Sequence, residues 1–478
     1  MVEPASLDPS TQAPLLGPTE ASDWGQLRIL VVAHGYPPNQ MAGAEQHMRR
    51  KVRWWRQHGH SVRVVTADPH LSREVPFGLI ERLLDQMDGV DVYRLRFAVA
   101  DGTRPLRETY FYPLLGPELV LHVEGFQPHI IYQLSGTIFG LHPLEIAAEY
   151  GIPSVLFATD FWHSCQRHTL LRPDGSCCPG PRHPSDCAAC RLTARRPAAI
   201  LGRHVQGLSW SLLAALQRTS AELMHLRTGG VRSFEEREEL VHNAIATAGL
   251  VICNSRFLTD AFVGLGVDPG RILTIRQGMD DLPAPEARVV PRSDGPLRVL
   301  YLGQITRHKG VDLLAEAVSR LIEQGLEIEL RIHGPVTDGV LKVDAGATGR
   351  VLVGHSLQRS EMFAALAQSD VLVVPSRWYE NSPNVILEAQ ALGVPVITAN
   401  HGGMAEMVRD GVDGLLYEPG DRKALEGALR RLALDRELLR RLAANAPRPH
   451  ALSDEMTPED QALARLVRVR QRSGVALG

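Results

Sequence analysis

The sequence predicts an α/β protein built from two Rossmann-like, doubly wound domains that face each other across a cleft. The chain has 478 residues, which is longer than a single hydrophobic core usually supports. Short apolar runs alternate with helix-like stretches in two separate series, and a segment rich in Pro, Asp, Arg and Ser divides them. Each series is typical of parallel strands joined by helices.

The first series predicts an N-terminal domain over residues 27–285. Residues 1–26 are rich in Pro, Ser, Thr and acidic residues, and we expect them to form a disordered tail. An apolar run at 27–32, a helix-like stretch at 45–58 and a second apolar run at 61–66 predict a βαβ unit. Further strands are predicted at 130–132, 154–157 and 250–253.

The second series predicts a C-terminal domain over residues 296–440, after a linker at residues 286–295. Its strands are predicted at 297–302, 328–332, 351–353, 371–374 and 394–397. Residues 441–478 follow as a C-terminal segment with a helical stretch at about 458–472. Doubly wound sheets bind ligands at the carboxyl ends of their strands, so the two domains together predict a site in the cleft between them.

Composition argues against several classes of protein. Lys plus Arg total 51 and Asp plus Glu total 54, a balance that gives no support for binding to nucleic acid. No segment approaches the roughly 18 consecutive apolar residues that span a bilayer. The N-terminus lacks the basic-then-apolar layout of a signal peptide. These observations predict a cytoplasmic protein.

The strongest functional signal is a pair of glutamates eight residues apart, Glu380 and Glu388. Glu388 lies in a helix-like run, so both carboxylates can reach one ligand, and ionised carboxylates suit hydroxyl-rich partners such as a sugar and a ribose. A helix start between them can present N–H groups to a phosphate. The residues that follow Glu380 are Asn381, Ser382, Pro383, Asn384 and Val385. Judged by its spacing alone, a pair of glutamates like this one more often lies on the solvated face of a helix.

A second signal is a loop directly after a predicted strand, which runs from Gly303 through Gln304 and Arg307 to Lys309. Glycine lets a backbone approach closely, and a lysine at the head of the next helix offers a positive charge to a diphosphate. An isolated Lys-Gly pair after a strand is usually structural. Its position ahead of Glu380 is what favours a binding role.

Two candidates fall in the N-terminal domain. Gly43 lies in Ala42-Gly43-Ala44-Glu45, between the first strand and the first helix, where an ordinary βα turn is the alternative interpretation. Asp160 ends a predicted strand and so points into the cleft, where it could orient an acceptor hydroxyl or take its proton. Capping of the next segment is the alternative for Asp160.

These stretches, in this order, resemble the E-x7-E, G-R-x(n)-K-G and G-G-x-E motifs of the family-4 GT-B retaining glycosyltransferases, the glycosyl transferases group 1 type. The resemblance extends from Leu27 to about residue 440. It implies a GT-B fold in which Glu380 approaches the donor sugar, Glu388 holds the ribose hydroxyls and Lys309 stabilises the leaving diphosphate. It also implies front-face attack without Mg²⁺ or another catalytic cofactor, and a C-terminal helix that crosses back to the N-terminal domain.

The chain departs from the family motifs at three positions. Gln304 stands where the family usually has arginine, which leaves the diphosphate site one cation short unless Arg307 or His308 compensates. Ala42 replaces the first glycine of G-G-x-E, and Thr159 precedes Asp160 where relatives commonly have histidine.

The resemblance implies a hexosyltransferase-class enzyme. It would move a sugar from a nucleotide-sugar donor to a glycan, lipid-linked or other hydroxyl acceptor in the synthesis of cell-envelope polysaccharide or glycoconjugates. Two alternatives stay open. One is a non-catalytic GT-B scaffold that binds sugar nucleotides, and the other is a GT-B sugar-nucleotide epimerase or phosphorylase, for which the sequence offers no motif.

Five of the six cysteines fall in an insertion at residues 161–192. This segment is rich in turns and has little apolar matter to bury, which favours a structural metal. The candidate ligands are Cys165, Cys178, Cys187 and Cys190, with Cys177 or His183 as substitutes. Zinc is the first expectation, an iron–sulfur cluster uses the same ligands, and free thiols or a redox pair are the alternative.

Two segments could dock on a membrane surface. Residues 49–56 mix cations with Trp54 and Trp55, and residues 195–218 carry apolar residues beside arginines. Basic amphipathic helices of this kind can lie in a membrane interface. Packing against the chain's own domain is the commoner outcome, so peripheral contact with the inner face of a membrane is a hypothesis.

Overall fold

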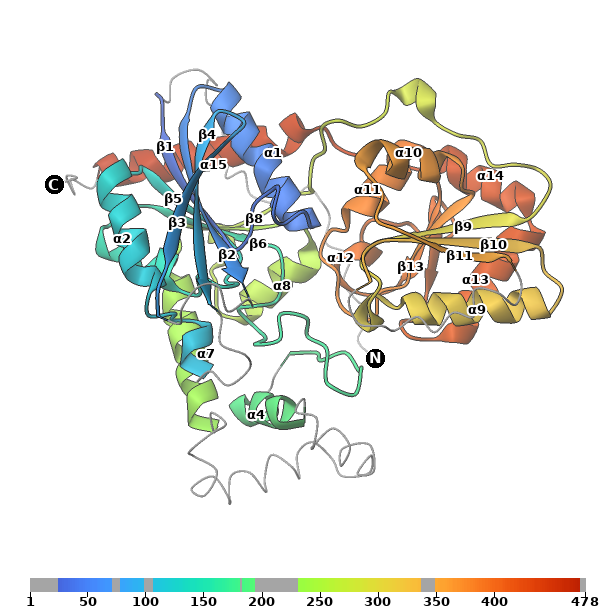
Figure 1. The fold of residues 1–478 in the computed structure, drawn as a ribbon, viewed down its shortest axis with the longest axis horizontal. Coiled ribbons are helices and arrows are strands. Elements are labelled where there is room, and N and C mark those ends of the chain that lie inside the picture. Colours follow the sequence, from blue (N-terminus) through green and yellow to red (C-terminus); the bar gives the residue numbers. More distant parts are fainter. Residues whose placement is uncertain are drawn as a thin grey trace.

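The computed structural model describes residues 25–70, 78–98, 106–180, 183–193, 231–336 and 349–472. They form two α/β domains that lie side by side, each with a mainly parallel sheet flanked by helices (Figure 1). Both predicted doubly wound domains are therefore confirmed. Residues 195–218 and nearly all of the predicted N-terminal tail lie outside the described residues.

The N-terminal domain contains an eight-stranded sheet. In spatial order its strands are β3 (Glu81–Met87), β4 (Val90–Ala98), β2 (Ser61–His70), β1 (Arg28–Ala33), β5 (Ile130–Leu134), β6 (Ser154–Ala158), β7 (Leu250–Cys253) and β8 (Ile272–Thr274). Every neighbouring pair is parallel except β3 and β4. Strands β5, β6 and β7 are buried along their whole length, as expected for parallel strands covered on both faces.

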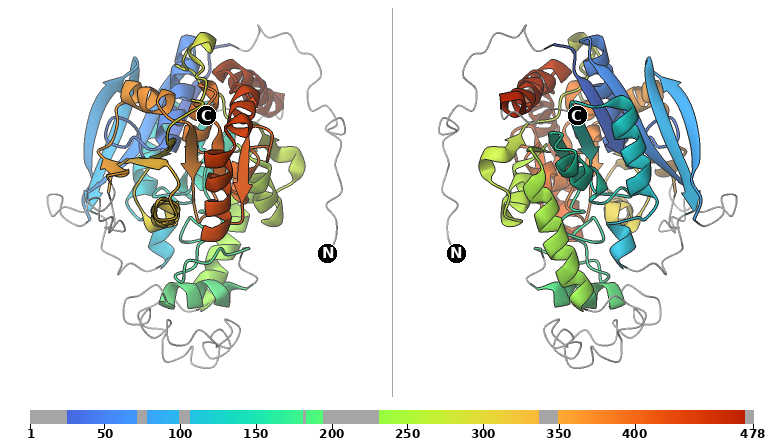
Figure 2. Two further views of the ribbon diagram at one scale, coloured as in Figure 1. Left: turned by 90° about the vertical axis from the view of Figure 1, so that its right-hand side faces the viewer. Right: turned by 90° about the vertical axis from the view of Figure 1, so that its left-hand side faces the viewer.

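Alternating side chains of β1 build the two hydrophobic faces of this sheet. Ile29 and Val31 share a core with side chains of α1 (Gly43–Gln57) and α15 (Leu452–Arg472). Leu30 and Val32 pack on the opposite face with α2 (Leu115–Phe126) and α3 (His142–Glu149). The other α-helices among the described residues of this domain are α4 (Pro184–Thr193), α7 (Val231–Thr247) and α8 (Arg256–Gly264). Helix α4 lies beside the end of α7 that is farthest from the sheet (Figures 1 and 2).

The C-terminal domain contains a six-stranded, all-parallel sheet. Its spatial order is β11 (Val351–Gly354), β10 (Ile328–His333), β9 (Leu297–Leu302), β12 (Val371–Val374), β13 (Val396–Ala399) and β14 (Gly414–Tyr417). Counted within the domain, this is the order 3-2-1-4-5-6 of a dinucleotide-binding fold, whose switch point lies between its first and fourth strands, here β9 and β12. The helices are α9 (Val311–Glu323), α10 (Arg359–Ala367), α11 (Asn384–Ala391), α12 (Gly402–Ala405), α13 (Arg422–Leu434) and α14 (Arg436–Asn445).

The structure differs from the sequence-based elements in a few places. The antiparallel hairpin of β3 and β4 was not predicted, because β3 has four exposed residues in a row and so shows no apolar alternation. Helix α1 begins at Gly43, two residues earlier than predicted, so that Glu45 lies in its first turn. Strand β13 begins at Val396, where residue 394 was predicted.

The chain passes between the domains twice, at neighbouring positions. The N–H of Met279, in the segment that leaves the N-terminal domain, donates to the His450 carbonyl (2.9 Å), and the N–H of Leu452 donates to the Met279 carbonyl (3.1 Å). Gly278 is required at this contact, since a Cβ there would lie 2.4 Å from the Ala451 carbonyl oxygen. Beyond this point α15 packs on the N-terminal domain beside α1 (Figure 1).

Buried charges hold α15 against α1. The Lys51 ammonium lies 2.7 Å from Glu455 Oε1 and 2.5 Å from Glu459 Oε2, and all three side chains have 0% exposure. His47 Nε2 lies 2.8 Å from Glu455 Oε1, and the Tyr132 hydroxyl donates to Glu459 Oε1 (2.9 Å). A single lysine therefore lies between two buried carboxylates.

The tryptophans of residues 49–56 also face α15. Trp55 is buried and Trp54 half-buried, and both indole N–H groups donate to the Asp460 carboxylate, at 2.9 and 2.7 Å. The packing alternative therefore holds for Trp55 and in part for Trp54. In the described ranges, no helix combines the length and the apolar character needed to cross a bilayer.

We expect Glu459→Gln to change how stability depends on pH. Burial and the neighbouring charge of Glu455 raise the pKa of Glu459 to about 7, against the opposing effect of Lys51. Between its ordinary value of 4.5 and about 7, the native chain holds a proton that the unfolded chain has released. The free energy of unfolding therefore falls as pH rises through this window.

Glu459→Gln removes this proton and keeps an acceptor for Tyr132. Between pH 5 and pH 8, the free energy of unfolding of Glu459→Gln should rise relative to that of the wild type by up to about 3 kcal/mol. Its melting temperature should rise relative to the wild type in the same direction. Thermal melts across this pH range check the prediction, with Glu437→Gln on the exposed face of α14 as control. Parallel pH profiles for wild type and Glu459→Gln would show that Glu459 is already ionised at pH 5.

Candidate active site

Two loops of the C-terminal domain meet at the switch point of its sheet. One follows β9 and contains Lys309; the other follows β12 and contains Glu380. Gly310 lets them touch: it has a φ of +71°, and a Cβ at this position would lie 1.9 Å from the Pro375 carbonyl oxygen. The close approach brings the lysine and the glutamate, 71 residues apart in the chain, into direct contact.

The Glu380 carboxylate is buried, and its surroundings favour the ionised form. Its Oε1 accepts hydrogen bonds from Lys309 Nζ (2.6 Å), Ser376 Oγ (2.8 Å) and Trp378 Nε1 (2.7 Å). Burial alone would raise the pKa of Glu380, but the Lys309 charge and the hydrogen bonds outweigh it and hold the pKa below its ordinary value. The site thus presents a fixed carboxylate beside a cation at the carboxyl ends of β9 and β12.

Glu388 lies in α11 in a different environment. Its Oε1 accepts from Arg359 Nη1 (3.1 Å), and Arg50 of the N-terminal domain contributes a second positive charge. Burial raises the pKa of Glu388, and the two arginines offset this effect only in part. The two glutamates of the predicted pair therefore have separate partners.

The segment between the two glutamates lies against the N-terminal domain. Asn384 Nδ2 donates to the Gly43 carbonyl (3.4 Å), and the Gln277 amide donates to Asn384 Oδ1. The Ser255 hydroxyl donates to Asn381 Oδ1 (2.5 Å). The predicted Gly43 loop is thus brought to the start of α11. Of the intervening residues, Pro383 precedes the first residue of α11, Val385 packs on the domain core, and Ser382 Oγ lies 4.0 Å from Met407 Sδ.

The remaining predicted donor-side residues are placed around the loop after β9. Gly303 has a φ of +149°, which favours glycine. The Gln304 and Arg307 side chains are exposed. The backbone carbonyl of Gln304 accepts from the Tyr301 hydroxyl (2.6 Å), and the backbone carbonyl of Arg307 accepts from Arg377 Nη1 (3.1 Å). No buried cationic side chain in this loop takes the place of the arginine that Gln304 replaces.

Asp160 lies after β6, among polar side chains of the N-terminal domain. Its Oδ2 accepts from Ser135 Oγ (2.8 Å) and Thr137 Oγ1 (3.3 Å), and its Oδ1 accepts from the N–H of Trp162 (2.9 Å). Capping of the following turn, the structural alternative, is therefore present. The adjacent Phe161 ring lies 6.1 Å from the ring of Tyr379, centroid to centroid, so the Asp160 loop reaches the loop of Glu380.

A histidine–glutamate pair lies near Asp160. His34 Nε2 lies 3.1 Å from Glu45 Oε1, and Glu45 Oε2 is buried with no hydrogen-bond partner among the described residues. Burial lowers the pKa of His34, but Glu45 and Asp160 outweigh this effect and raise it above its ordinary value. Glu45 belongs to the same stretch as Gly43, so the pair lies at the first turn of α1.

Several site residues were not predicted. Ser376 and Trp378 donate hydrogen bonds to Glu380, and Arg359 donates one to Glu388. His34 forms a hydrogen bond with Glu45. Ser376 and Trp378 precede Glu380 by a few residues and could have been noted by proximity. No local pattern identifies Arg359, because it is 29 residues from its partner.

The cysteines divide into two environments. Cys177 Sγ donates to the Arg377 carbonyl of the C-terminal domain (3.0 Å) and lies 3.8 Å from His401 Nδ1. Cys165, Cys178 and Cys187 pack against the core of the N-terminal domain. In the part of the chain that the structure describes, no group of three or more His, Cys, Asp or Glu side chains has the arrangement of a metal site.

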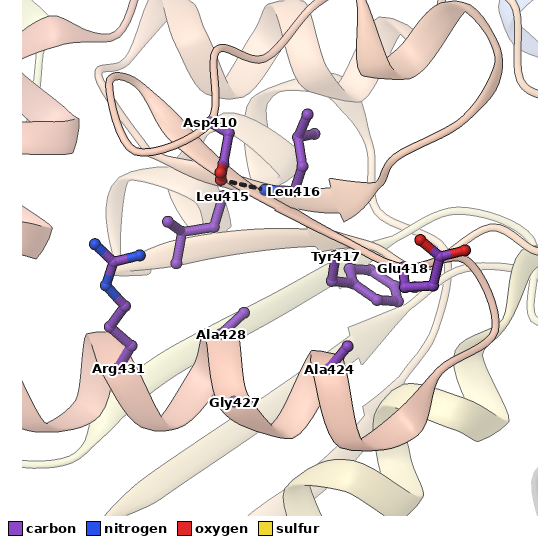
Figure 3. A pocket seen from close by; sticks show the side chains of 9 residues that line it. All are labelled: Asp410, Leu415, Leu416, Tyr417, Glu418, Ala424, Gly427, Ala428 and Arg431. Carbon is purple, nitrogen blue, oxygen red and sulfur yellow. Dashed lines mark hydrogen bonds between the residues drawn. The ribbon is translucent and has the colours of Figure 1, made fainter. Parts of the chain in front are cut away.

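A shallow pocket of about 290 Å³ lies elsewhere in the C-terminal domain, between β14 and α13 (Figure 3). Asp410, Glu418 and Arg431 contribute its charged groups. It shares no lining residue with the surroundings of Glu380 and Glu388, so we do not assign it to the candidate active site.

The two facing doubly wound domains and their C-terminal helix define the GT-B fold of glycosyltransferases. Solved structures with this fold match almost the whole chain. HepE of Anabaena in complex with UDP has a TM-score of 0.55 and 16% identity, over 94% of this chain and 99% of that chain. Sucrose-phosphate synthase of Thermosynechococcus elongatus has a TM-score of 0.58 and 16% identity, over 94% of this chain and 99% of that chain.

Sequence comparison is more specific for the C-terminal domain. Residues 285–448 match the family model for glycosyl transferases group 1. The chain is 34% identical to glycogen synthase of Mycobacterium tuberculosis (strain CDC 1551 / Oshkosh) over 210 residues, 43% of this chain and 50% of the relative. It is 32% identical to D-inositol 3-phosphate glycosyltransferase of Rhodococcus jostii (strain RHA1), over 43% of this chain and 49% of the relative. The chain thus spans about half the length of these curated relatives.

Proposed function

We propose that this chain is a retaining, family-4 glycosyltransferase that moves a sugar from a nucleotide-sugar donor to a hydroxyl acceptor. The observation that carries the proposal is the Lys309–Glu380 contact of 2.6 Å at the switch point of a glycosyl transferases group 1 domain. A cation and an ionised carboxylate fixed side by side suit a reaction in which a diphosphate leaves and positive charge develops on the sugar.

In this mechanism Lys309 neutralises the charge that builds up on the leaving diphosphate. Its ammonium is partly exposed, with 24% of the side chain accessible, so it can reach a bound donor while Glu380 holds it in place. Glu380, ionised and fixed by three donors, accepts from sugar hydroxyls or stabilises the oxocarbenium-like centre. Backbone N–H groups at the start of α11 add donors for phosphate oxygens.

Glu388 is assigned to the ribose of the donor. Its second carboxylate oxygen is available for vicinal hydroxyls, since the Arg359 hydrogen bond engages only Oε1. Asp160 already accepts three hydrogen bonds, so we assign it to positioning of the acceptor hydroxyl. The attack takes place on the face from which the diphosphate departs, which gives retention of configuration and needs no Mg²⁺.

The donor class is supported by the fold relatives, whose solved structures include complexes with UDP and with UDP-glucose. The matched relatives act on unlike acceptors, as their names as glycogen synthase and D-inositol 3-phosphate glycosyltransferase indicate. For this chain we propose a glycan or lipid-linked acceptor in cell-envelope polysaccharide or glycoconjugate synthesis. Such a reaction takes place in the cytoplasm, at the inner face of the membrane when the acceptor is lipid-linked.

A non-catalytic sugar-nucleotide-binding scaffold is the second candidate. The exposed Gln304 side chain favours it, because the family's arginine is then missing at this position of the loop after β9. An isolated glycosylated product would establish transfer, and its anomeric configuration, read by NMR, would establish retention. Nucleotide binding with neither transfer nor hydrolysis of any donor would favour the scaffold.

Glu388→Ala is expected to weaken donor binding by about 10- to 100-fold, the range for loss of hydrogen bonds to a buried charged group. A thermal-shift and titration screen against UDP-, GDP-, ADP- and dTDP-sugars measures this, and the nucleotide that raises the wild-type melting temperature identifies the base. Glu437→Ala, in the exposed face of α14, is the matched control. A response to no nucleotide, from a folded wild type, would remove the donor-site assignment.

A further inference from the structure

The first turn of α8, in the N-terminal domain, lies against α12 of the C-terminal domain (Figure 1). The N–H groups that open an α-helix have no acceptor within the helix and need one from elsewhere. In α8 the N-cap residue Ser255 serves one of them, because its Oγ accepts from the N–H of Leu258 (3.1 Å). The N–H groups of Arg256 and Phe257 require another partner.

That partner is a carboxylate of the other domain. Glu406, the residue after α12, accepts from the N–H of Arg256 at Oε2 (3.0 Å) and from the N–H of Phe257 at Oε1 (2.7 Å). Each carboxylate oxygen therefore binds one backbone donor. A negative charge at this end of a helix is also favoured by the helix dipole. Glu406 thus caps a helix that does not belong to its own domain.

Two glycines bring α12 close enough for this cap. Gly402 has a φ of +63°, and a Cβ there would lie 2.8 Å from the Glu380 carbonyl oxygen. A Cβ on Gly403 would lie 1.9 Å from the Asn381 carbonyl oxygen and 2.7 Å from Ser255 Cβ. The N–H of Gly403 donates to the Glu380 carbonyl (2.7 Å). Because neither position leaves room for a side chain, α12 packs directly on the loop of Glu380 and on the start of α8.

The start of α8 also contacts the residues on both sides of Glu380. The Ser255 hydroxyl donates to Asn381 Oδ1 (2.5 Å), and the Phe257 ring lies 4.8 Å from the Tyr379 ring, centroid to centroid. Both contacts cross between the domains, as the two hydrogen bonds of Glu406 do. The loop of the proposed catalytic carboxylate is therefore held from the N-terminal domain as well as from its own.

We propose that Glu406 is a positioning residue, which holds the two domains in this closed arrangement by capping α8 and so fixes the loop of Glu380. Opening of the domains breaks these contacts as a set and returns two N–H groups and a carboxylate to water. The cap shifts the equilibrium toward the closed form by about 2- to 30-fold, the range for a single capping side chain.

A cap inside one domain provides the matched control. Asp421 Oδ1 accepts from the N–H groups of Lys423 and Ala424 at the start of α13, at 2.8 and 3.1 Å. Asp421→Ala therefore removes a carboxylate with two backbone donors, as Glu406→Ala does, but it affects no contact between the domains. It should lower the melting temperature and leave the closed arrangement unchanged.

Amide hydrogen exchange of the full-length chain without ligand, read by mass spectrometry, measures how often the domains part. The peptide over residues 376–381 reports this opening, because Tyr379 and Asn381 contact α8. Its exchange should be about 2- to 30-fold faster in Glu406→Ala than in the wild type. Glu406→Gln, which keeps one acceptor oxygen, should show a smaller increase, and Asp421→Ala none. Unchanged exchange in Glu406→Ala would overturn the proposal.

Charge reversal offers a second measurement. Glu406→Lys places a cation at the positive end of α8, so it should favour the open form more than Glu406→Ala does. Small-angle X-ray scattering should give it a larger radius of gyration than the wild type, while Asp421→Ala scatters as the wild type does. Circular dichroism checks that each variant is folded. Equal radii for the wild type and folded Glu406→Lys would contradict the proposal, and if Glu406→Lys does not fold, the exchange of Glu406→Ala decides.

The effect on turnover rests on the proposed function, and kinetics separates the two. Glu406→Ala should raise the KM for the donor more than it lowers kcat, because only the closed fraction binds productively. A loss confined to kcat would contradict the positioning role. Sugar transfer with unchanged exchange in Glu406→Ala would refute the role of Glu406 and leave the proposed function standing. Faster exchange in Glu406→Ala with no transfer by the wild type would do the reverse.

Discussion

Replacing Lys309 with alanine is expected to lower the rate of sugar transfer by about 10²- to 10³-fold, the cost of removing one preorganised group that stabilises developing negative charge. The buried Glu380 carboxylate also loses its counter-ion, so its pKa should rise, because burial is then opposed only by the hydrogen bonds from Ser376 and Trp378. The effect should appear mainly in kcat, because the charge on the diphosphate grows as the bond to the sugar breaks.

Steady-state kinetics with the donor identified by thermal shift check this result. Lys423→Ala, which removes an exposed lysine at the start of α13, is the matched control and should leave kcat unchanged. Glu380→Gln should cost a comparable amount, and the double variant should be little worse than either single variant, because the two groups act as one unit. Turnover within a factor of about two of wild type in Lys309→Ala would contradict the proposed role of the lysine in catalysis.

Replacing Lys51 with methionine is expected to lower the free energy of unfolding by about 3–5 kcal/mol. The substitution keeps an unbranched side chain that is one atom shorter and removes the cation that lies 2.7 and 2.5 Å from the two glutamates of α15. Both carboxyl groups are then buried, with His47 and the Gly278 N–H as the remaining partners of Glu455 and the Tyr132 hydroxyl as the remaining partner of Glu459. Chemical denaturation measures the loss, and hydrogen exchange over residues 452–472 should show that α15 opens first.

Arg53→Met is the control for this prediction. It lies on the same helix, but its ion pairs with Asp280 and Asp281 are long, at 3.9 and 3.8 Å, and its side chain is 35% exposed. We expect it to cost less than about 1 kcal/mol. Equal losses for Lys51→Met and Arg53→Met would mean that the buried charges contribute no more than surface ion pairs do.

The sequence predicted the parts of the fold that depend on local apolar patterning. Strands such as residues 28–33 and 297–302 are short, buried runs, and the pattern alone identifies them. Strand β3 was missed because hydrogen bonds to β4 hold it at the sheet edge with most of its side chains exposed.

The sequence predicted which residues form the candidate site better than it predicted which of them contact each other. Lys309, Glu380 and Glu388 follow from motifs, but nothing local indicates that the first two bond each other while the third pairs with Arg359. These contacts join residues that are far apart in the chain.

The paired backbone at Met279 and Ala451 bears on how the domains move. Two chain segments cross from one domain to the other within hydrogen-bonding distance of each other, at 2.9 and 3.1 Å. Two adjacent tethers permit bending about one line through that point and oppose twisting about any other. Opening of the GT-B halves should therefore follow a single hinge axis. That motion would part Asn384 from Gly43 and Asn381 from Ser255 together, so under the proposed function one opening event would admit both donor and acceptor.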